Sequence, residues 1–171
     1  MRNNCRSMLA ATIFFAAASW AQNLPEVPDG AQALSLTGQP LYAAAPAQGA
    51  LGRLATARAD YDSDPSDADN IIWYGRRTAY TGDYRGAIEI FSEGIETHPL
   101  DARMYRHRGH RYVSIREFDR AIQDLEQAAE LIEGTDNEVE PDGLPNALNI
   151  PVSSLHGNIW YHLGLAYYLK Q

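Results

Sequence analysis

The stretch DYRGAI at residues 83–88 has a counterpart, EFDRAI, at residues 117–122. The two stretches are 34 residues apart, and the same offset superposes Gly75 on Gly109. Self-similarity at a fixed period of this length is typical of repeat architectures, in which each copy is one supersecondary unit stacked on the next. The sequence therefore predicts a stack of similar units.

Each copy has the apolar spacing of two helices joined by a short turn. In the second half of each copy, apolar residues recur at intervals of three and four, which gives a helix one apolar stripe. These residues are Tyr84, Ala87, Ile88, Phe91 and Ile95 in the first copy, and Phe118, Ala121, Ile122, Leu125 and Ala129 in the second. We therefore expect an all-α protein, a short α-solenoid of antiparallel helix hairpins, with repeat 1 at residues 68–101 and repeat 2 at 102–135.

A third occurrence of the pattern begins near Gly157, where residues 160–167 read WYHLGLAY. On these residues and the 34-residue period, the chain resembles the tetratricopeptide repeat (TPR) family, whose helix-turn-helix unit carries W-x2-L-G-x2-Y. The resemblance covers most of residues 50–171 and is to exported, bacterial-type members of the family. It implies a concave groove lined by the first helices of successive units. It also implies a core position for Trp160, which opens the signature.

The rest of the chain divides into segments of distinct composition. Residues 22–48 hold four prolines and no sustained helical period, so this lead-in either lies extended against the folded domain or is a mobile linker. Prolines in residues 136–156 cannot continue a helix and must loop out of the stack. The predicted segments are a signal peptide (1–21), an extended lead-in segment (22–48), a degenerate capping helix (49–67), an acidic, proline-containing insertion (136–156) and the first helix of an incomplete repeat 3 (157–171).

The N-terminus has the features of an export signal. Arg2 and Arg6 precede an apolar run, residues 8–20, that is too short to span a bilayer. Small residues near the end of the run suit cleavage after Ala21, with Ala18 as the alternative. We therefore expect an exported protein, periplasmic or secreted, without a membrane span.

Arg108 departs from the family pattern in a way that the fold must resolve. The resemblance implies a buried leucine at this position, and an unpaired buried charge is strongly destabilising. Either Arg108 pairs with a carboxylate from a neighbouring helix, or the local helix is rotated.

Charge is segregated along the chain. The net charge is -8 at pH 7, which argues against nucleic-acid binding, yet residues 102–116 hold five arginines and two histidines and no carboxylate. Arginine forms bidentate, charge-assisted hydrogen bonds with carboxylate and phosphate groups. The sequence therefore predicts one of two outcomes: the groove binds a ligand that bears such groups, or the arginines pair with acidic neighbours in the same chain. The groove candidates are Trp73, Arg76, Tyr80, Arg103, Arg106, His107, His110, Tyr161 and His162.

Catalytic and cofactor signatures are missing from the sequence. No serine lies in a Gly-x-Ser-x-Gly turn, and neither type of glycine-rich phosphate-binding loop occurs. His107, His110 and His162 are surrounded by arginine, which disfavours a cation, so we expect no metal site. The expected function is a non-catalytic protein–protein interaction module or scaffold, without a cofactor. Two alternatives remain: a structural helical unit that assembles through its end helices, and an accessory part of an enzyme whose catalytic region lies elsewhere.

The insertion concentrates negative charge. Residues 133–142, which include the start of the insertion, carry five carboxylates: Glu133, Asp136, Glu138, Glu140 and Asp142. Either this loop folds over the groove and competes with an anionic ligand, or it stays in water as charge runs usually do.

The last predicted helix, residues 158–170, is apolar nearly all round. A single repeat helix cannot bury such a surface alone. We therefore expect either that the chain is a fragment of a longer protein, or that a partner or a second copy covers this helix by association.

Overall fold

The structure is a computed structural model that describes residues 26–140, 146–150 and 152–171. The predicted signal peptide, residues 1–21, lies outside the described residues. The elements are β1 (Ala33–Leu34), β2 (Pro40–Leu41), α1 (Ala50–Ser63), α2 (Ala68–Ala79), α3 (Tyr84–Thr97), α4 (Ala102–Ser114), α5 (Phe118–Leu131) and α6 (Leu155–Lys170). The prediction of an all-α fold is confirmed. Among these helices, none combines the length and the apolar character that crossing a bilayer requires.

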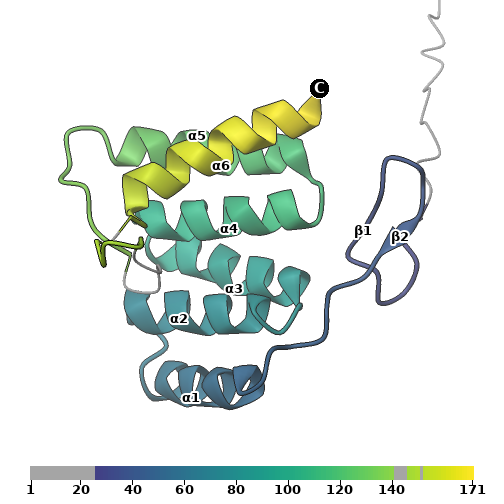
Figure 1. Ribbon diagram of the computed structural model, residues 1–171. Helices are drawn as coiled ribbons and strands as arrows, with labels where there is room; N and C mark the ends of the chain where they lie inside the picture. The colour runs from purple at the N-terminus through teal and green to yellow at the C-terminus, as the bar shows by residue number, and fades with distance from the viewer. Residues whose placement is uncertain (1–25, 141–145, 151) are drawn as a thin grey trace, which may run out of the picture.

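The helices form a stack in which each one packs against the next in sequence. Figure 1 shows α1 at one end of this stack and α5 and α6 at the other. Contacts also join α2 to α4 and α4 to α6, so the first helices of the three units form one continuous layer. This layer places side chains from α2, α4 and α6 side by side although they are far apart in sequence.

Glycine at one repeat position lets the two helices of a unit approach closely. A Cβ atom at Gly75 would lie 2.6 Å from the ring of Phe91, and one at Gly109 would lie 2.8 Å from Cγ of Leu125. Phe91 and Leu125 are among the largest fully buried side chains of the core. The 34-residue offset joins both the two glycines and the two large residues, so the same contact closes both repeats.

This contact predicts that a glycine-to-alanine substitution lowers stability in repeats 1 and 2 but raises it at the equivalent position of the third unit. We expect Gly75→Ala and Gly109→Ala each to lower the free energy of unfolding by about 1–3 kcal/mol, because the new methyl group overpacks the core. Gly164 occupies the same position in the third unit, where nothing lies within 4 Å of an added Cβ. Gly164→Ala should therefore raise stability by up to about 1 kcal/mol through helix propensity. Urea unfolding measures all three, and equal effects at the three positions would contradict this account.

Arg108 pairs with a carboxylate from the neighbouring helix. Its Nε and Nη2 each donate to Asp124 of α5, both at 2.7 Å, and its Nη1 donates to Ser92 of α3 at 3.1 Å. Asp124 is buried. The prediction of an inter-helix ion pair is thus confirmed, and the arginine joins three helices where a leucine would only have packed.

Trp160 does not lie in the core, and the prediction that it does is wrong. Its side chain is 57% exposed, whereas Ile71, at the equivalent position of repeat 1, is buried and would touch a Cβ added at Gly94 of α3. The position is buried only when a second helix of the same unit covers it. In the described chain no helix covers α6 in this way.

Other large residues of α6 are exposed as well, namely Tyr161, Tyr167, Tyr168 and Leu169. The opposite side of the helix buries Leu155, Ile159, Leu163 and Ala166. That a continuation of the chain, a partner or a second copy covers the exposed side stays a prediction.

The lead-in segment forms a short hairpin that contacts the domain. β1 and β2 pair antiparallel, with Ala33 opposite Leu41. Nη2 of Arg85, in α3, donates to the carbonyl oxygen of Gln32 at 3.1 Å, and a Cβ at Gly82 would lie 2.5 Å from Cβ of Ala43. Figure 1 shows the hairpin beside the stack, at the end of the extended segment that leads to α1.

Candidate functional site

Three buried arginines line one cavity on the layer formed by α2, α4 and α6. Arg76 comes from α2, and Arg106 and Arg111 come from α4; their exposed fractions are 8%, 7% and 9%. All three line a cavity of about 150 Å³. The cavity is also lined by Ala79, Tyr80, Phe91, His107, His110, Glu140 and Ser153.

The local structure of α4 explains why so many basic residues share one face. Asp101 caps the helix by accepting a hydrogen bond from the backbone N–H of Arg103 at 2.9 Å. Residues three, four or seven positions apart lie on the same side of a helix, so Arg103, Arg106, His107, His110 and Arg111 follow one broad stripe. Because α4 contacts both α2 and α6, this stripe lies at the centre of the layer that the three helices form.

Two histidines are neutral acceptors in this cavity. Nη1 of Arg106 donates to Nδ1 of His107 at 2.7 Å, and Nη2 of Arg111 donates to Nδ1 of His110 at 2.6 Å. A guanidinium has only donors, so each Nδ1 must offer its lone pair. Burial, followed by the positive charge of nearby arginines, lowers the pKa of both histidines. The imidazoles therefore complete the hydrogen bonding of the arginines without adding charge.

His162 extends the cluster from α6. Its ring centroid lies 3.9 Å from that of His110, and its Nδ1–H donates to the carbonyl oxygen of Asn158 at 2.7 Å. Burial lowers the pKa of His162 to about 4. The edge of Tyr161 meets the His162 ring, with the tyrosine itself exposed.

The arginines keep their charge in spite of burial. Desolvation lowers the pKa of Arg106 and lowers that of Arg111 to about 10. Both remain protonated at neutral pH. The floor of the cavity is therefore a cluster of positive charge held away from bulk water.

The depressed pKa of His162 makes stability depend on pH. The folded state keeps this imidazole neutral down to about pH 4, whereas the unfolded chain binds a proton below about pH 6.5. The stabilising contribution is thus complete above pH 6.5 and is lost as the pH falls toward 4. We expect His162→Gln to reduce the slope of the unfolding free energy in this window by about 1.4 kcal/mol per pH unit, the value for one proton. Urea titrations at several pH values measure it, and parallel curves for the two proteins would show that His162 titrates normally in the fold.

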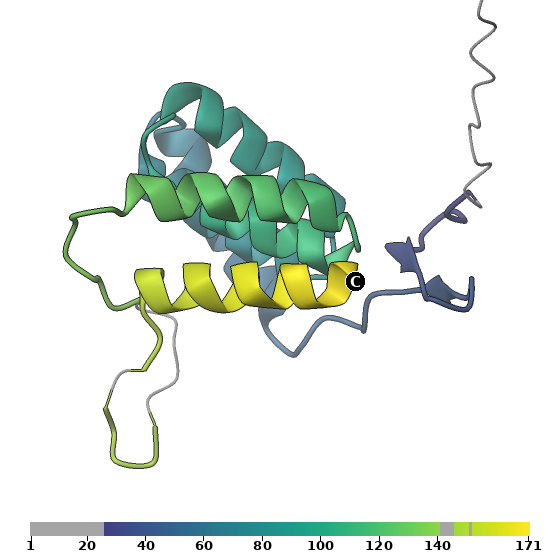
Figure 2. The same ribbon diagram turned by 90° about the horizontal axis from the view of Figure 1, so that it is seen from above.

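A strap from the insertion reaches into the cavity. We use the name strap for residues 137–140, which pair with residues 153–155: the N–H of Glu140 donates to the carbonyl of Ser153 at 3.0 Å, and the N–H of Leu155 donates to that of Glu138 at 2.9 Å. Figure 2 shows the insertion leaving the stack where α6 begins. The strap places Oε2 of Glu140 3.0 Å from Nη2 of Arg106.

A second cavity, of about 120 Å³, adjoins the strap. Trp73 and Arg76 line it from α2, and Arg103 and His107 line it from α4. The guanidinium carbon of Arg76 lies 4.5 Å from the ring centre of Trp73, which is a cation–π distance. Glu140 lines this cavity as well as the first one.

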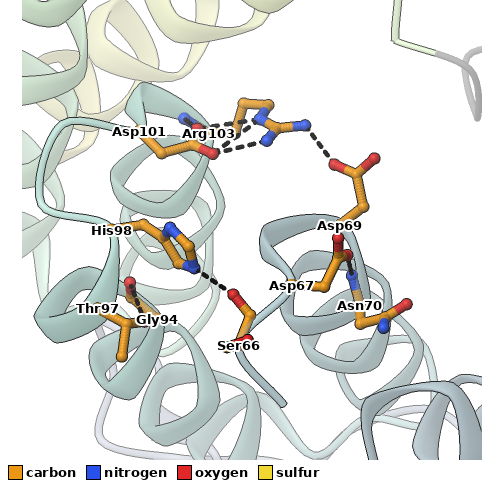
Figure 3. A network of polar contacts seen from close by, with 9 residues as sticks. All are labelled: Ser66, Asp67, Asp69, Asn70, Gly94, Thr97, His98, Asp101 and Arg103. Carbon is orange, nitrogen blue, oxygen red and sulfur yellow. Dashed lines mark hydrogen bonds and ion pairs between the residues drawn. The ribbon is translucent and has the colours of Figure 1, made fainter. Parts of the chain in front are cut away.

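Arg103 is paired within the chain. It donates to both carboxylate oxygens of Asp101 and, at 2.7 Å, to Oδ1 of Asp69 in α2 (Figure 3). Asp69 is the equivalent of Arg103 one repeat earlier, so the bridge ties successive first helices together. In the same view His98 contacts the carbonyl oxygen of Ser66 at 2.8 Å. Arg103 therefore has the self-paired environment that was one of its two predicted outcomes.

The structure brings most of the sequence-predicted groove residues into one region. Arg76, Tyr80, Arg106, His107 and His110 line the first cavity. Trp73 and Arg103 line the second cavity, His162 lies beside His110, and the exposed Tyr161 contacts the ring of His162.

Arg111 is a groove residue that the sequence analysis did not select. Its position four residues after His107 was the available signal, because that spacing keeps the same helix face. Of the insertion carboxylates that the structure describes, Glu140 alone enters the cavity, and the acidic pattern of the loop did not distinguish it from the others.

Two solved structures of SycD from Yersinia enterocolitica have similar folds. One is described as the type III secretion translocator chaperone SycD, and the other as SycD in complex with a peptide of the translocator YopD. Each superposes with a TM-score of 0.54 and 19% sequence identity over 71% of this chain, covering 74% and 82% of the respective SycD chains. This likeness establishes a TPR-like all-α fold. No protein-family model and no curated protein sequence matches the chain.

Proposed function

We propose that the protein is a non-catalytic protein-binding module of the TPR type, whose concave groove binds an acidic segment of a partner protein. The observation that carries the proposal is the convergence of Arg76, Arg106 and Arg111, all buried, on one cavity of the concave layer. Burying cationic groups lowers stability, so a fold that keeps three of them together points to a role beyond folding.

The surroundings of the arginines suit a peptide. Buried guanidinium groups recognise carboxylates by charge-assisted hydrogen bonds, which are stronger where water is excluded. Trp73 and the exposed ring of Tyr80 offer apolar and aromatic surface beside them. The peptide complex of SycD supports a peptide ligand for a chain of this fold.

The proposal includes export. The N-terminal charge, the short apolar run and the small residues before Gln22 support removal of a signal peptide and a periplasmic or secreted mature protein.

Binding of a defined acidic peptide tests the proposal. We expect a capped oligoglutamate peptide to bind, and a capped oligoglutamine peptide of the same length not to bind, because the groove recognises carboxylates. Raising the salt concentration from about 0.05 M to about 0.5 M should weaken the binding by at least about tenfold. Fluorescence anisotropy with labelled peptides measures both effects.

Two arginine variants locate the site. Arg106→Gln removes a groove guanidinium and should abolish oligoglutamate binding. Arg120→Gln removes the same charge from an exposed position on α5 and should leave binding within about twofold, since exposed charges are well screened. Circular dichroism establishes that both variants are folded. Equal affinity for the two peptides, or equal loss in the two variants, would contradict the proposal.

A further inference from the structure

The carboxylate that contacts Arg106 belongs to the chain's own insertion. The side chain of Glu140 is 11% exposed, whereas Glu133, Asp136 and Glu138 are all exposed. One acid of the loop is therefore taken out of water while its neighbours stay in it. The hydrogen bonds that pair the strap with residues 153–155 do not require an acidic residue at this position, because at Glu140 they use only the backbone N–H.

The ion pair uses only part of what each partner offers. Nη2 of Arg106 donates to Oε2 of Glu140, while Oε1 of Glu140 and Nε of Arg106 are buried and make no hydrogen bond within the described chain. An arginine and a carboxylate in the best geometry form two parallel hydrogen bonds. A carboxylate that approached Arg106 more freely could therefore bind it better than Glu140 does.

The strap is held by few interactions. In the described chain its backbone makes the two hydrogen bonds to residues 153–155. The side chain of Asn137 adds two more: Nδ2 donates to Oγ of Ser154 at 3.1 Å, and Oδ1 accepts from the backbone N–H of His156 at 3.1 Å. A segment with so few contacts can move at a small free-energy cost compared with a helix of the stack. Withdrawal of the Glu140 side chain breaks its ion pair with Arg106, and a carboxylate of the ligand that takes its place restores one.

Glu140 also lines both cavities of the groove. The cavities of about 150 Å³ and 120 Å³ share Arg76, His107 and Glu140 in their walls. Each is small for a peptide, which needs room for several side chains. Displacement of Glu140 therefore removes one side chain from the walls of both cavities.

From these contacts we infer that the groove contains a carboxylate-binding subsite centred on Arg106. Glu140 fills this subsite in the free protein, and an acidic side chain of the partner segment displaces it. The inference rests on the proposed function. The ligand group is a glutamate or aspartate carboxylate, and Glu140 is the competitor that regulates its binding. The apparent affinity of the groove is then the intrinsic affinity multiplied by the fraction of molecules in which Glu140 has left the subsite.

Removing the negative charge of Glu140 tests the inference. Glu140→Gln keeps the size of the side chain and weakens its hold on Arg106, so it should tighten binding of the capped oligoglutamate peptide by about fivefold or more. Asp136→Asn removes the same charge from an exposed position of the same insertion and should change affinity by less than about twofold. Fluorescence anisotropy at low salt measures both, with the unaltered protein alongside.

A third variant tests whether the gain in peptide affinity depends on Arg106. The double variant Arg106→Gln/Glu140→Gln should bind no better than Arg106→Gln alone, because the subsite is gone. Should Glu140→Gln fail to fold, Glu140→Asp replaces it: the shorter side chain withdraws the carboxylate from Arg106 with the charge retained, and affinity should again rise.

The outcomes separate the two proposals. Equal tightening by Glu140→Gln and Asp136→Asn, no tightening by Glu140→Gln, or a gain that persists without Arg106 would overturn the inference and leave the peptide-binding function standing. Failure of oligoglutamate to bind any of these proteins would overturn the proposed function itself.

Discussion

The positive charge buried on the layer of α2, α4 and α6 is the constraint around which the site is organised. Arg106 and Arg111 stay protonated at neutral pH and Arg76 lines the same cavity, so the surroundings of these side chains must supply acceptors. Neutral imidazoles of His107 and His110 accept hydrogen bonds from the guanidinium groups, and Glu140 supplies a negative charge. The low pKa values of the histidines follow mainly from their burial, and the positive charge of the neighbouring arginines lowers them further.

The fold creates this constraint through its repeat. Close contact of Gly75 with Phe91, and of Gly109 with Leu125, packs the two helices of each unit together. The first helices are then brought into one layer, and the bridge from Arg103 to Asp69 ties two of them at equivalent positions. Arg76, Arg106 and Arg111, which the repeat places on the inner face, are buried there although they are charged. The basic stripe of α4 thus becomes a buried cluster.

Much of this was predictable from the sequence, because periodicity determines which residues share a face. The 34-residue period predicted the helical stack and the basic face of α4. The family resemblance marked Arg108 as a position that needed either a carboxylate partner or a rotated helix, and the structure has the carboxylate partner. Trp160 was misjudged because its burial depends on a covering helix rather than on its own position. The choice of Glu140 among the loop acids depends on the pairing of the strap with residues 153–155, which follows no periodic pattern and is set by tertiary contacts.

A double-mutant cycle between Arg106 and Glu140 tests the central claim most directly, because it measures their interaction in the protein without any ligand. The free energies of unfolding of the unaltered protein, Arg106→Gln, Glu140→Gln and the double variant are obtained from urea denaturation. If Glu140 occupies the subsite and compensates the buried guanidinium, the two substitutions are coupled by about 1–3 kcal/mol, with the double variant more stable than additivity predicts. Additive effects, within about 0.3 kcal/mol, would contradict the account.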